Sequence, residues 1–313
     1  MKICKIENHE VEDFLNHHFS SPTHWPEWNL LVQQHFHSNF YYLGAREDGI
    51  LKGICPVHKT KFKKFLFRLQ SGQFQLIPNG GWIFSEPHTL GKHFFPASWN
   101  EAHQTFTLPL LGEFNVINGH HTGQVKKTLI IDLNKSLDEI WSQDIHSKRR
   151  NMIRKAEKEG LEVREMRTEG DLSDFYSLYA EATRRFSNNP LTIDFFKHMF
   201  FDFQHVELNL FSAYQENKQL ASVGIISDKN YSIYWLGSND LYAKNRGQGE
   251  LLQWHAIGAM KNKGCRYYDL CYIEPEKLPN IYKFKKGFSR DEYNVLFVNH
   301  KSFPFRIFNK VLL

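Results

Sequence analysis

The chain has 313 residues, which is long for one domain and predicts either one large domain or two of medium size. Charged residues make up only 23% of the chain, and aromatic residues make up 15%. The aromatic side chains supply enough apolar volume for a true core, and this composition excludes a disordered chain. The formal net charge of +5 is too small for a polybasic protein but suits a protein with an anionic ligand.

Two β-hairpins are predicted, one in each half of the chain. The first has strands at 40–45 and 50–57, and the second has strands at 208–214 and 220–227, each pair joined by a short polar turn. The same plan in both halves favours a duplicated domain, although two unrelated hairpins would give the same pattern.

A helical region is predicted between the hairpins. A capping box begins at Ser136, and the helix that follows at 147–159 is strongly basic and ends at Gly160. Two more helices, at 172–186 and 192–203, precede the second hairpin. Helical and strand patterns thus occur along the whole chain, which indicates the α/β or α+β class.

Residues 231–273 predict a strand, a polar loop, a helix and a second strand in succession. The loop contains Lys244, Arg246, Gly247 and Gly249. A loop that leads into a helix places backbone N–H groups at the positive end of that helix, a geometry that binds phosphate. The glycines would let the backbone approach such a ligand, and the basic side chains would add charge. The alternative is a glycine-rich turn that caps an ordinary helix.

Three segments of the sequence resemble known acyltransferases. KNRGQGELL, with Lys244 at the first position where Gln or Arg is usual, resembles the acyl-CoA pyrophosphate loop of the GNAT acyltransferases. KRRNMIRKAEKEG at 148–160 and IYKFKKGFS at 281–289 resemble two signatures of the FemAB-like aminoacyl- and acyltransferases of the GNAT superfamily. The segments SPTHWPEW, YWLGSND and YYDL follow the order of that family, so the resemblance covers nearly the whole chain.

The resemblance implies an α/β fold of two tandem GNAT-like domains with mixed sheets. It places the first domain at 1–146, completed by the C-terminal segment 296–313, and the second domain, with the donor site, at 147–295. The chain has no long heptad run, so no coiled-coil insertion is expected. The implied function is transfer of an aminoacyl group from aminoacyl-tRNA, or of an acyl group from acyl-CoA, to a primary amine of a cell-wall or cell-envelope saccharide or peptide precursor.

The strand 231–237 and the strand after it supply candidate catalytic residues. In a GNAT-like site, the resemblance implies that backbone N–H groups of the first strand bind the donor carbonyl. Either Tyr234 or Trp235 faces the cleft; we favour Tyr234 as a proton donor and keep Trp235 as a substrate contact. A core tyrosine is the alternative. Asp269 would orient or deprotonate the amine, or else only cap the following loop.

Five further candidates come from the two signatures. Phe284 and Lys285 match the Phe-Lys pair that the family associates with the 3′ end of the donor and with the charge that develops during transfer. The alternative is a solvated basic helix face. Arg149, Arg150 and Arg154 are candidates for a substrate phosphate, unless their helix only covers the domain junction.

The expected partners are a donor co-substrate, either acyl-CoA or aminoacyl-tRNA, and an amine acceptor that is free, lipid-linked or nucleotide-linked. No tightly bound cofactor and no DNA are expected, and the 17 His and four Cys residues lack the spacing of a metal site. No apolar run reaches the roughly 18–20 residues of a membrane span, and no secretory signal is visible, so the expected location is cytoplasmic, including the inner face of the membrane. The alternative functions are a non-catalytic RNA- or anionic-glycan-binding protein on the same fold, and a degenerate member with a structural role.

Overall fold

The computed structural model describes residues 1–63, 66–71, 78, 80–86, 100–107 and 122–301. The chain forms two compact units, Met1–Lys127 together with the segment from Tyr293, and Thr128–Glu292. Of the segment expected to complete the first domain, residues 302–313 lie outside the described residues.

The boundary between the units falls earlier than the expected division at 146/147. The reason is that the segment after Lys127 packs within the second unit. Its residues up to Asp132 pair with a strand of that unit, and Ile140 and Ile145 belong to its apolar core. At the other end, the division follows Glu292 rather than residue 295.

The first unit contains a mostly antiparallel sheet and two helices. Its strand order is β1-β2-β3-β4-β6-β13, with β5 paired to β3 and a parallel pair between β4 and β6. The elements are β1 (Lys2–Ile6), α1 (Asn8–His17), a 3₁₀ turn (Pro22–His24), α2 (Pro26–Phe36), β2 (Asn39–Glu47), β3 (Ile50–Lys63), β4 (Leu66–Ser71), β5 (Ile83–Phe84), β6 (Asn100–Thr107) and β13 (Glu292–Lys301).

The first predicted hairpin is confirmed as β2 and β3. Asp48 and Gly49 form its two-residue loop, with φ angles of 49° and 82°. Positive φ at both central positions defines a type I′ turn, whose twist matches that of the paired strands. The Asp-Gly dipeptide therefore fixes the register of this hairpin.

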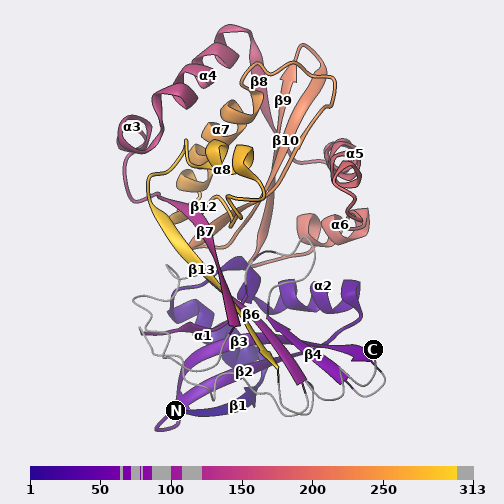
Figure 1. Ribbon diagram of the computed structural model, residues 1–313, viewed down its shortest axis with the longest axis vertical. Helices are drawn as coiled ribbons and strands as arrows, with labels where there is room; N and C mark the ends of the chain where they lie inside the picture. The colour runs from indigo at the N-terminus through magenta and orange to yellow at the C-terminus, as the bar shows by residue number, and fades with distance from the viewer. Residues whose placement is uncertain (64–65, 72–77, 79, 87–99, 108–121, 302–313) are drawn as a thin grey trace. The chain divides into compact units, whose positions relative to one another are not determined.

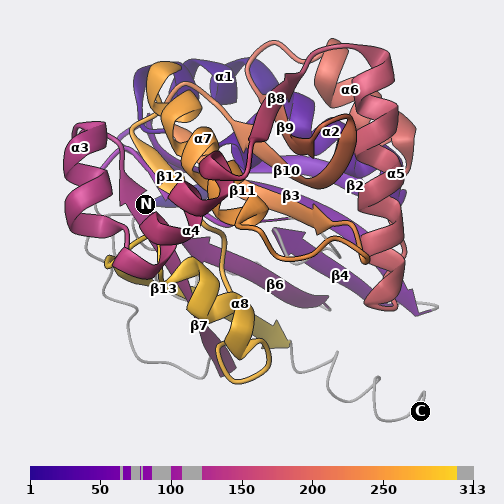
Figure 2. The ribbon, with the colours of Figure 1, turned by 90° about the horizontal axis from the view of Figure 1, so that it is seen from above.

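The second unit contains a mixed sheet with the strand order β7-β12-β11-β10-β9-β8, in which β11 and β12 are parallel. Helices α4, α7 and α8 lie on one face of this sheet, and α5 and α6 lie on the other (Figures 1 and 2). The elements are β7 (Thr122–Asp132), α3 (Leu137–Glu139), a π-helical turn (Ile140–Asp144), α4 (Ser147–Lys158), β8 (Leu161–Met166), α5 (Glu169–Arg185), α6 (Ile193–Phe201), β9 (Glu207–Gln215), β10 (Lys218–Ser227), β11 (Tyr231–Asn239), α7 (Gln248–Asn262), β12 (Tyr267–Asp269) and α8 (Pro279–Lys285).

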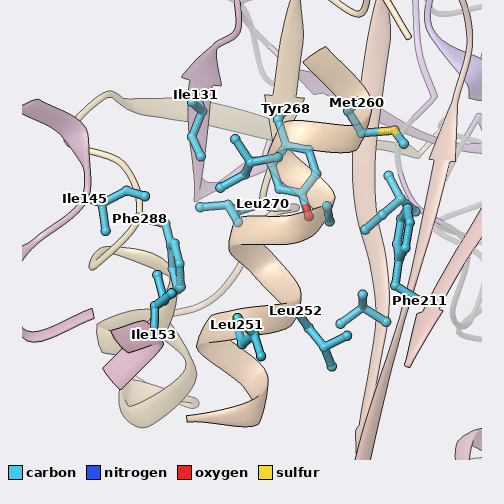
Figure 3. Close-up of a cluster of buried hydrophobic side chains, with 14 of the residues drawn as sticks. Ile131, Ile145, Ile153, Phe211, Leu251, Leu252, Met260, Tyr268, Leu270 and Phe288 are labelled. Carbon is cyan, nitrogen blue, oxygen red and sulfur yellow. The ribbon is translucent and has the colours of Figure 1, made fainter. Parts of the chain in front are cut away.

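Helix α7 lies in the middle of the core of the second unit (Figure 3). On one side, Leu252 and Met260 extend toward the sheet, where Phe211 lies. On the other side, Leu251 lies near Ile153 of α4. Because both sides of α7 are apolar, its position is fixed relative to β9, β10 and α4, which in turn fixes where its N-terminus lies.

The predicted helices and the second hairpin are confirmed with small shifts of their ends, and the predicted capping box at Ser136 is present. The strand predicted up to residue 273 is shorter than expected, because β12 ends at Asp269 and Cys271 has a φ of 61° that no strand contains. Within the described residues the longest helix is α5, with 17 residues, so no coiled-coil arm is found there. None of the helices in the same part of the chain combines the length and the apolar character that crossing a membrane requires.

Candidate active site

The sheet of the second unit opens between β11 and β12. These parallel strands pair only between Tyr231–Ile233 and Tyr267–Asp269. Strand β12 ends there, whereas β11 continues to Asn239 with β10 as its neighbour. Beyond Ile233, β11 therefore no longer pairs with β12.

A β-bulge determines which side chains of β11 face this opening. The register with β10 shifts between Tyr234 and Leu236, which makes Trp235 the extra residue. Tyr234 lines a cleft at the opening. Trp235 instead packs against Phe196 of α6, with 5.7 Å between ring centroids, and does not line that cleft.

The cleft has a volume of about 770 Å³ and lies entirely within the second unit. Its walls come from α4, the end of α5, β10, β11, the loop after β11, the start of α7, and α8. Among the predicted site residues, those that line it are Arg149, Tyr234, Gly249 and Phe284. A site of this size and composition suits the reactive end of a donor molecule.

Lys285 lies at the end of α8 and is only 8% exposed. Its Nζ donates a hydrogen bond to the backbone carbonyl of Cys271 at 3.1 Å and lies 5.6 Å from the centroid of the Tyr234 ring. Burial lowers the pKa of the Lys285 ammonium, while Cys271 and Asp269 act in the opposite direction. The ammonium thus contacts a ring that itself lines the cleft, and it does not point into bulk water.

Asp269 is fully buried at the end of β12. One carboxylate oxygen accepts hydrogen bonds from the Thr128 hydroxyl and from the Cys271 N–H at 2.8 Å, and the other accepts from the Tyr231 hydroxyl at 2.8 Å. Burial raises the pKa of this carboxyl, and the hydrogen bonds partly oppose that effect. The bond to Cys271 gives Asp269 the loop-capping role that the sequence left open.

Gly247 is required by the packing of α4 on the loop before α7. It has a φ of 93°, and a Cβ atom there would lie 2.3 Å from the Met152 carbonyl oxygen. The Gly247 N–H donates to Asn245 Oδ1 at 3.1 Å. The Arg246 N–H donates to Gln248 Oε1 at 2.8 Å. The Met152 carbonyl thus fills the space beside Gly247 where we expected a phosphate. Protein side chains also accept hydrogen bonds from two of the backbone N–H groups that we expected to bind that phosphate.

Of the other three predicted residues at this loop, one lines the cleft and two do not. The Arg246 guanidinium donates to the Glu159 carboxylate at 2.8 Å, and the Lys244 side chain is exposed and does not line the cleft. Gly249 does line the cleft, and a Cβ atom there would lie 3.7 Å from the Phe284 ring, an ordinary contact. Its N–H is one of those that the first turn of a helix leaves without an intrahelical acceptor.

Arg149 connects the two family signatures. Its guanidinium donates to the Glu250 carboxylate at 2.6 Å and to the Lys283 carbonyl at 3.1 Å, and it lies 5.0 Å from the centroid of the Phe284 ring. A Cβ atom on Gly287 would lie 2.5 Å from Arg149 Nε. The glycine of the KKG sequence therefore makes room for the arginine of the KRR sequence.

Arg150 and Arg154 lie outside the cleft. The Arg150 guanidinium donates to the carbonyls of Trp141, Ser142 and Ile145 at 2.9, 3.1 and 2.7 Å. It thereby satisfies carbonyl groups at the end of the π-helical turn. Arg154 is exposed and lies 5.3 Å from the centroid of the Trp141 ring.

Several residues that line the cleft were missed by the sequence analysis, among them Glu250, Arg185 and Phe186. Glu250 is a charged residue in the first turn of α7, directly before the buried Leu251 and Leu252, and that contrast was the available signal. Phe186 is 71% exposed where α5 ends, and Arg185 donates to the Asn239 carbonyl at 2.7 Å. In the part of the chain that is described, no group of three His, Cys, Asp or Glu residues could hold a metal ion.

Comparison with protein families gives the class of protein. Residues 147–286 match the acetyltransferase (GNAT) domain family. This range begins at α4, ends just after α8, and contains the opened strands and the residues that line the cleft. The second unit therefore has the GNAT fold that the resemblance implied.

One curated relative and two solved structures extend the match, the structures in fold alone. UDP-N-acetylmuramoylpentapeptide-lysine N(6)-alanyltransferase of Weissella viridescens is 28% identical over 179 residues, which are 55% of this chain and 52% of that protein. The chain thus spans about half the length of this curated relative. The crystal structure of FemX matches with a TM-score of 0.63 and 13% identity over 94% of this chain and 97% of its own. L-PGS from Bacillus licheniformis matches with a TM-score of 0.53 and 11% identity over 98% and 95%. These matches confirm the resemblance to FemAB-like acyltransferases and the α/β fold with two GNAT-like domains.

Proposed function

We propose that this protein is a FemAB-like N-acyltransferase that moves an aminoacyl group from aminoacyl-tRNA to a primary amine of a cell-wall or cell-envelope precursor. The main support is the nearly buried Lys285 ammonium, which lies 5.6 Å from the centroid of the Tyr234 ring, next to the point where β12 stops pairing with β11. The relative from Weissella viridescens is named for alanyl transfer to a lysine amine of a nucleotide-linked peptide, which supports this class of donor and acceptor.

In the proposed reaction the acceptor nitrogen attacks the ester carbonyl of the donor. A C–N bond forms and the carbonyl oxygen becomes an oxyanion; then the ester C–O bond breaks, the ribose oxygen leaves, and a proton passes from the nitrogen to that oxygen. Backbone N–H groups of β11 and the Lys285 ammonium stabilise the oxyanion. Burial raises the pKa of Tyr234 to about 12, so this phenol stays neutral at neutral pH and can donate a hydrogen bond to the oxyanion.

The loop before α7 supports charged tRNA over acyl-CoA as the donor. Its Arg246 and Gly247 N–H groups already donate to protein side chains. The Arg246 side chain pairs with Glu159, and the carboxylate of Glu250 lies in the first turn of α7. A pyrophosphate at this helix end would compete with those groups. The 3′ end of a tRNA needs only its terminal ester in the cleft, and Gly249 and Phe284 would contact it there.

The acceptor is a primary amine of a saccharide or peptide precursor, and a nucleotide-linked or lipid-linked form fits the same chemistry. Because aminoacyl-tRNA is a cytoplasmic molecule, the reaction takes place in the cytoplasm or at the inner face of the membrane. Arg154 is the predicted substrate contact that remains exposed, so it remains a candidate for an RNA phosphate. Arg150 has no part in the proposal, because its guanidinium is held by three carbonyls.

The test uses the full chain with two radiolabelled donors, alanyl-tRNA and acetyl-CoA, and with the uncharged tRNA as a control. Each is incubated with a lysine-containing UDP-linked muramoyl peptide. We expect label to move from alanyl-tRNA to the peptide, with thermal stabilisation by charged tRNA and none by acetyl-CoA. Acetyl transfer without alanyl transfer would reassign the donor. Salt-sensitive binding of both tRNAs with no product would favour the RNA-binding alternative.

A further inference from the structure

A closed group of polar side chains lies beside Lys285. Thr128, Tyr231 and Asp269 are each 0% exposed, and both hydroxyls donate to the Asp269 carboxylate. The Cys271 N–H is a third donor, at 2.8 Å. A carboxylate that accepts three hydrogen bonds in a fully buried position is not open to an acceptor amine. Asp269 instead contacts Cys271, which in turn contacts Lys285.

Cys271 connects this group to the lysine. Its φ of 61° lies in the left-handed region, which costs a non-glycine residue roughly 1–2 kcal/mol and persists only where the surroundings hold it. Its N–H is bound by Asp269, and its carbonyl accepts the hydrogen bond from Lys285 at 3.1 Å. The peptide group before the Cys271 Cα is thus held by the carboxylate, while the peptide group after it binds the ammonium.

We propose that Thr128, Tyr231 and Asp269 are positioning residues for Lys285. They fix the left-handed turn at Cys271, so that its carbonyl keeps the ammonium beside the Tyr234 ring and the cleft. This inference rests on the proposed function, and it replaces the expected role of Asp269 as a base with an indirect one.

The three N–H bonds of the Lys285 ammonium explain how its position would matter in the reaction. A lysine ammonium has three N–H bonds. One donates to the Cys271 carbonyl, and the Tyr234 ring accounts for a second direction. The third can donate to the oxyanion of the reacting ester. A shift of the Cys271 carbonyl would turn this third bond away, and displacements of about 1 Å at a reacting centre cost up to about 100-fold in rate.

The test compares Tyr231→Phe and Thr128→Val with the control Tyr268→Phe. Tyr268 is also 0% exposed and also donates one hydrogen bond, to Gln253 Oε1 at 2.9 Å, but its partner lies on α7. We expect the two test variants to lower kcat about tenfold with little change in KM, and to move the alkaline limb of the pH profile to lower pH. The limb moves in that direction because a weaker bond to Cys271 favours the neutral amine. The control should match the parent protein.

A second measurement needs no substrate. In protein labelled with ¹⁵N-lysine, the Lys285 Nζ signal is assigned by its absence in Lys285→Met. We expect this signal to shift or broaden in Tyr231→Phe and Thr128→Val, and to stay unchanged in Tyr268→Phe. An unchanged signal in both test variants overturns the proposal, whatever happens to kcat. If the signal changes but even the parent protein transfers nothing, the positioning of Lys285 stands and the proposed function fails.

Discussion

Lys285 is a charged side chain in a nearly dry position. Burial lowers the pKa of its ammonium, which means that the folded protein disfavours the charge that the proposed reaction needs. Such a residue reduces stability in exchange for function, since an apolar side chain of similar length would suit the same space better.

Replacement of Lys285 should therefore separate activity from stability. We expect Lys285→Met to lose about 100-fold or more in kcat, the cost of removing one oxyanion donor, and to unfold at no lower urea concentration than the parent. Transfer kinetics and urea denaturation check the two effects. The exposed Lys244→Met is the matched control. A Lys285→Met protein with parental kcat would remove the lysine from the mechanism.

Arg149 was predicted to bind substrate, and it forms an ion pair with Glu250 inside the cleft wall. The two side chains are 16% and 6% exposed. A buried pair adds little to stability by itself, but removal of one partner leaves the other charge buried and uncompensated. The pair thus offers a way to distinguish a structural arginine from a substrate contact.

We expect Arg149→Met to lower the free energy of unfolding by about 3–5 kcal/mol, because Glu250 then stays buried without a counter-charge. The double variant Arg149→Met with Glu250→Leu should recover most of that loss. Chemical denaturation of both proteins checks this. Should the stable double variant also transfer normally, Arg149 has no contact with substrate; if it folds well and is inactive, the predicted substrate role gains support.

At the scale of elements, the start of α7 depends on two glycines that have different functions. Gly247 allows both a left-handed backbone and the approach of the Met152 carbonyl from α4. Gly249 has an ordinary φ and only an ordinary contact with Phe284. The GxG spacing therefore combines one glycine that the fold requires with one that faces the cleft.

We expect Gly247→Ala to lower the free energy of unfolding by roughly 3 kcal/mol, from backbone strain and the clash with α4. Gly249→Ala should leave stability unchanged or slightly raised, since alanine favours helix, and should reduce transfer if the donor passes close to this position. Thermal unfolding and transfer assays on both variants measure these effects. Equal destabilisation by the two alanines would contradict the different packing of these positions.

At the scale of the whole molecule, the first unit contains a buried polar network built around two histidines. Burial lowers the pKa of His24 to about 4 and that of His58 to about 3. His24 hydrogen-bonds to the Gly81 carbonyl at 3.0 Å, and His58 to Asn29 at 3.1 Å and Ser38 at 2.9 Å. These contacts fit neutral rings, so protonation opposes folding of this unit.

Acid should therefore destabilise the first unit. Between pH 6.5 and about 4 the unfolded chain binds protons at these histidines and the folded chain does not, so stability falls as pH falls. We expect a loss of about 3 kcal/mol from His24 alone. Urea denaturation from pH 7 to pH 4, followed by hydrogen exchange, should show early opening of peptides around His24 and His58. His58→Gln should weaken this dependence, and the exposed His9→Gln should not.

The sequence was sufficient to predict most elements of the second unit, but in the first unit it predicted only the hairpin of β2 and β3. Hydrophobic periodicity, the Asp48-Gly49 turn and the capping residues are local signals, so they predicted helices and hairpins close to the observed ones. It also indicated the GNAT-like class through segments whose order along the chain can be read directly. The observed unit boundary precedes the end of β7, α3 and the π-helical turn, which were expected in the first domain, because nothing local marks the pairing of Asp132 with Tyr267.

The site was predicted less completely, and the reason is distance along the chain. The sequence alone singled out Lys285, Asp269, Tyr234 and Arg149 as candidates, because their chemistry suits acyl transfer. Only the tertiary structure decided what each one contacts, because a bulge turns Trp235 toward α6, a carbonyl of α4 fills the space beside Gly247, and Glu250 pairs with Arg149 across 101 positions. Burial and pairing arise from contacts between distant segments, and these contacts determine which charges are available for catalysis.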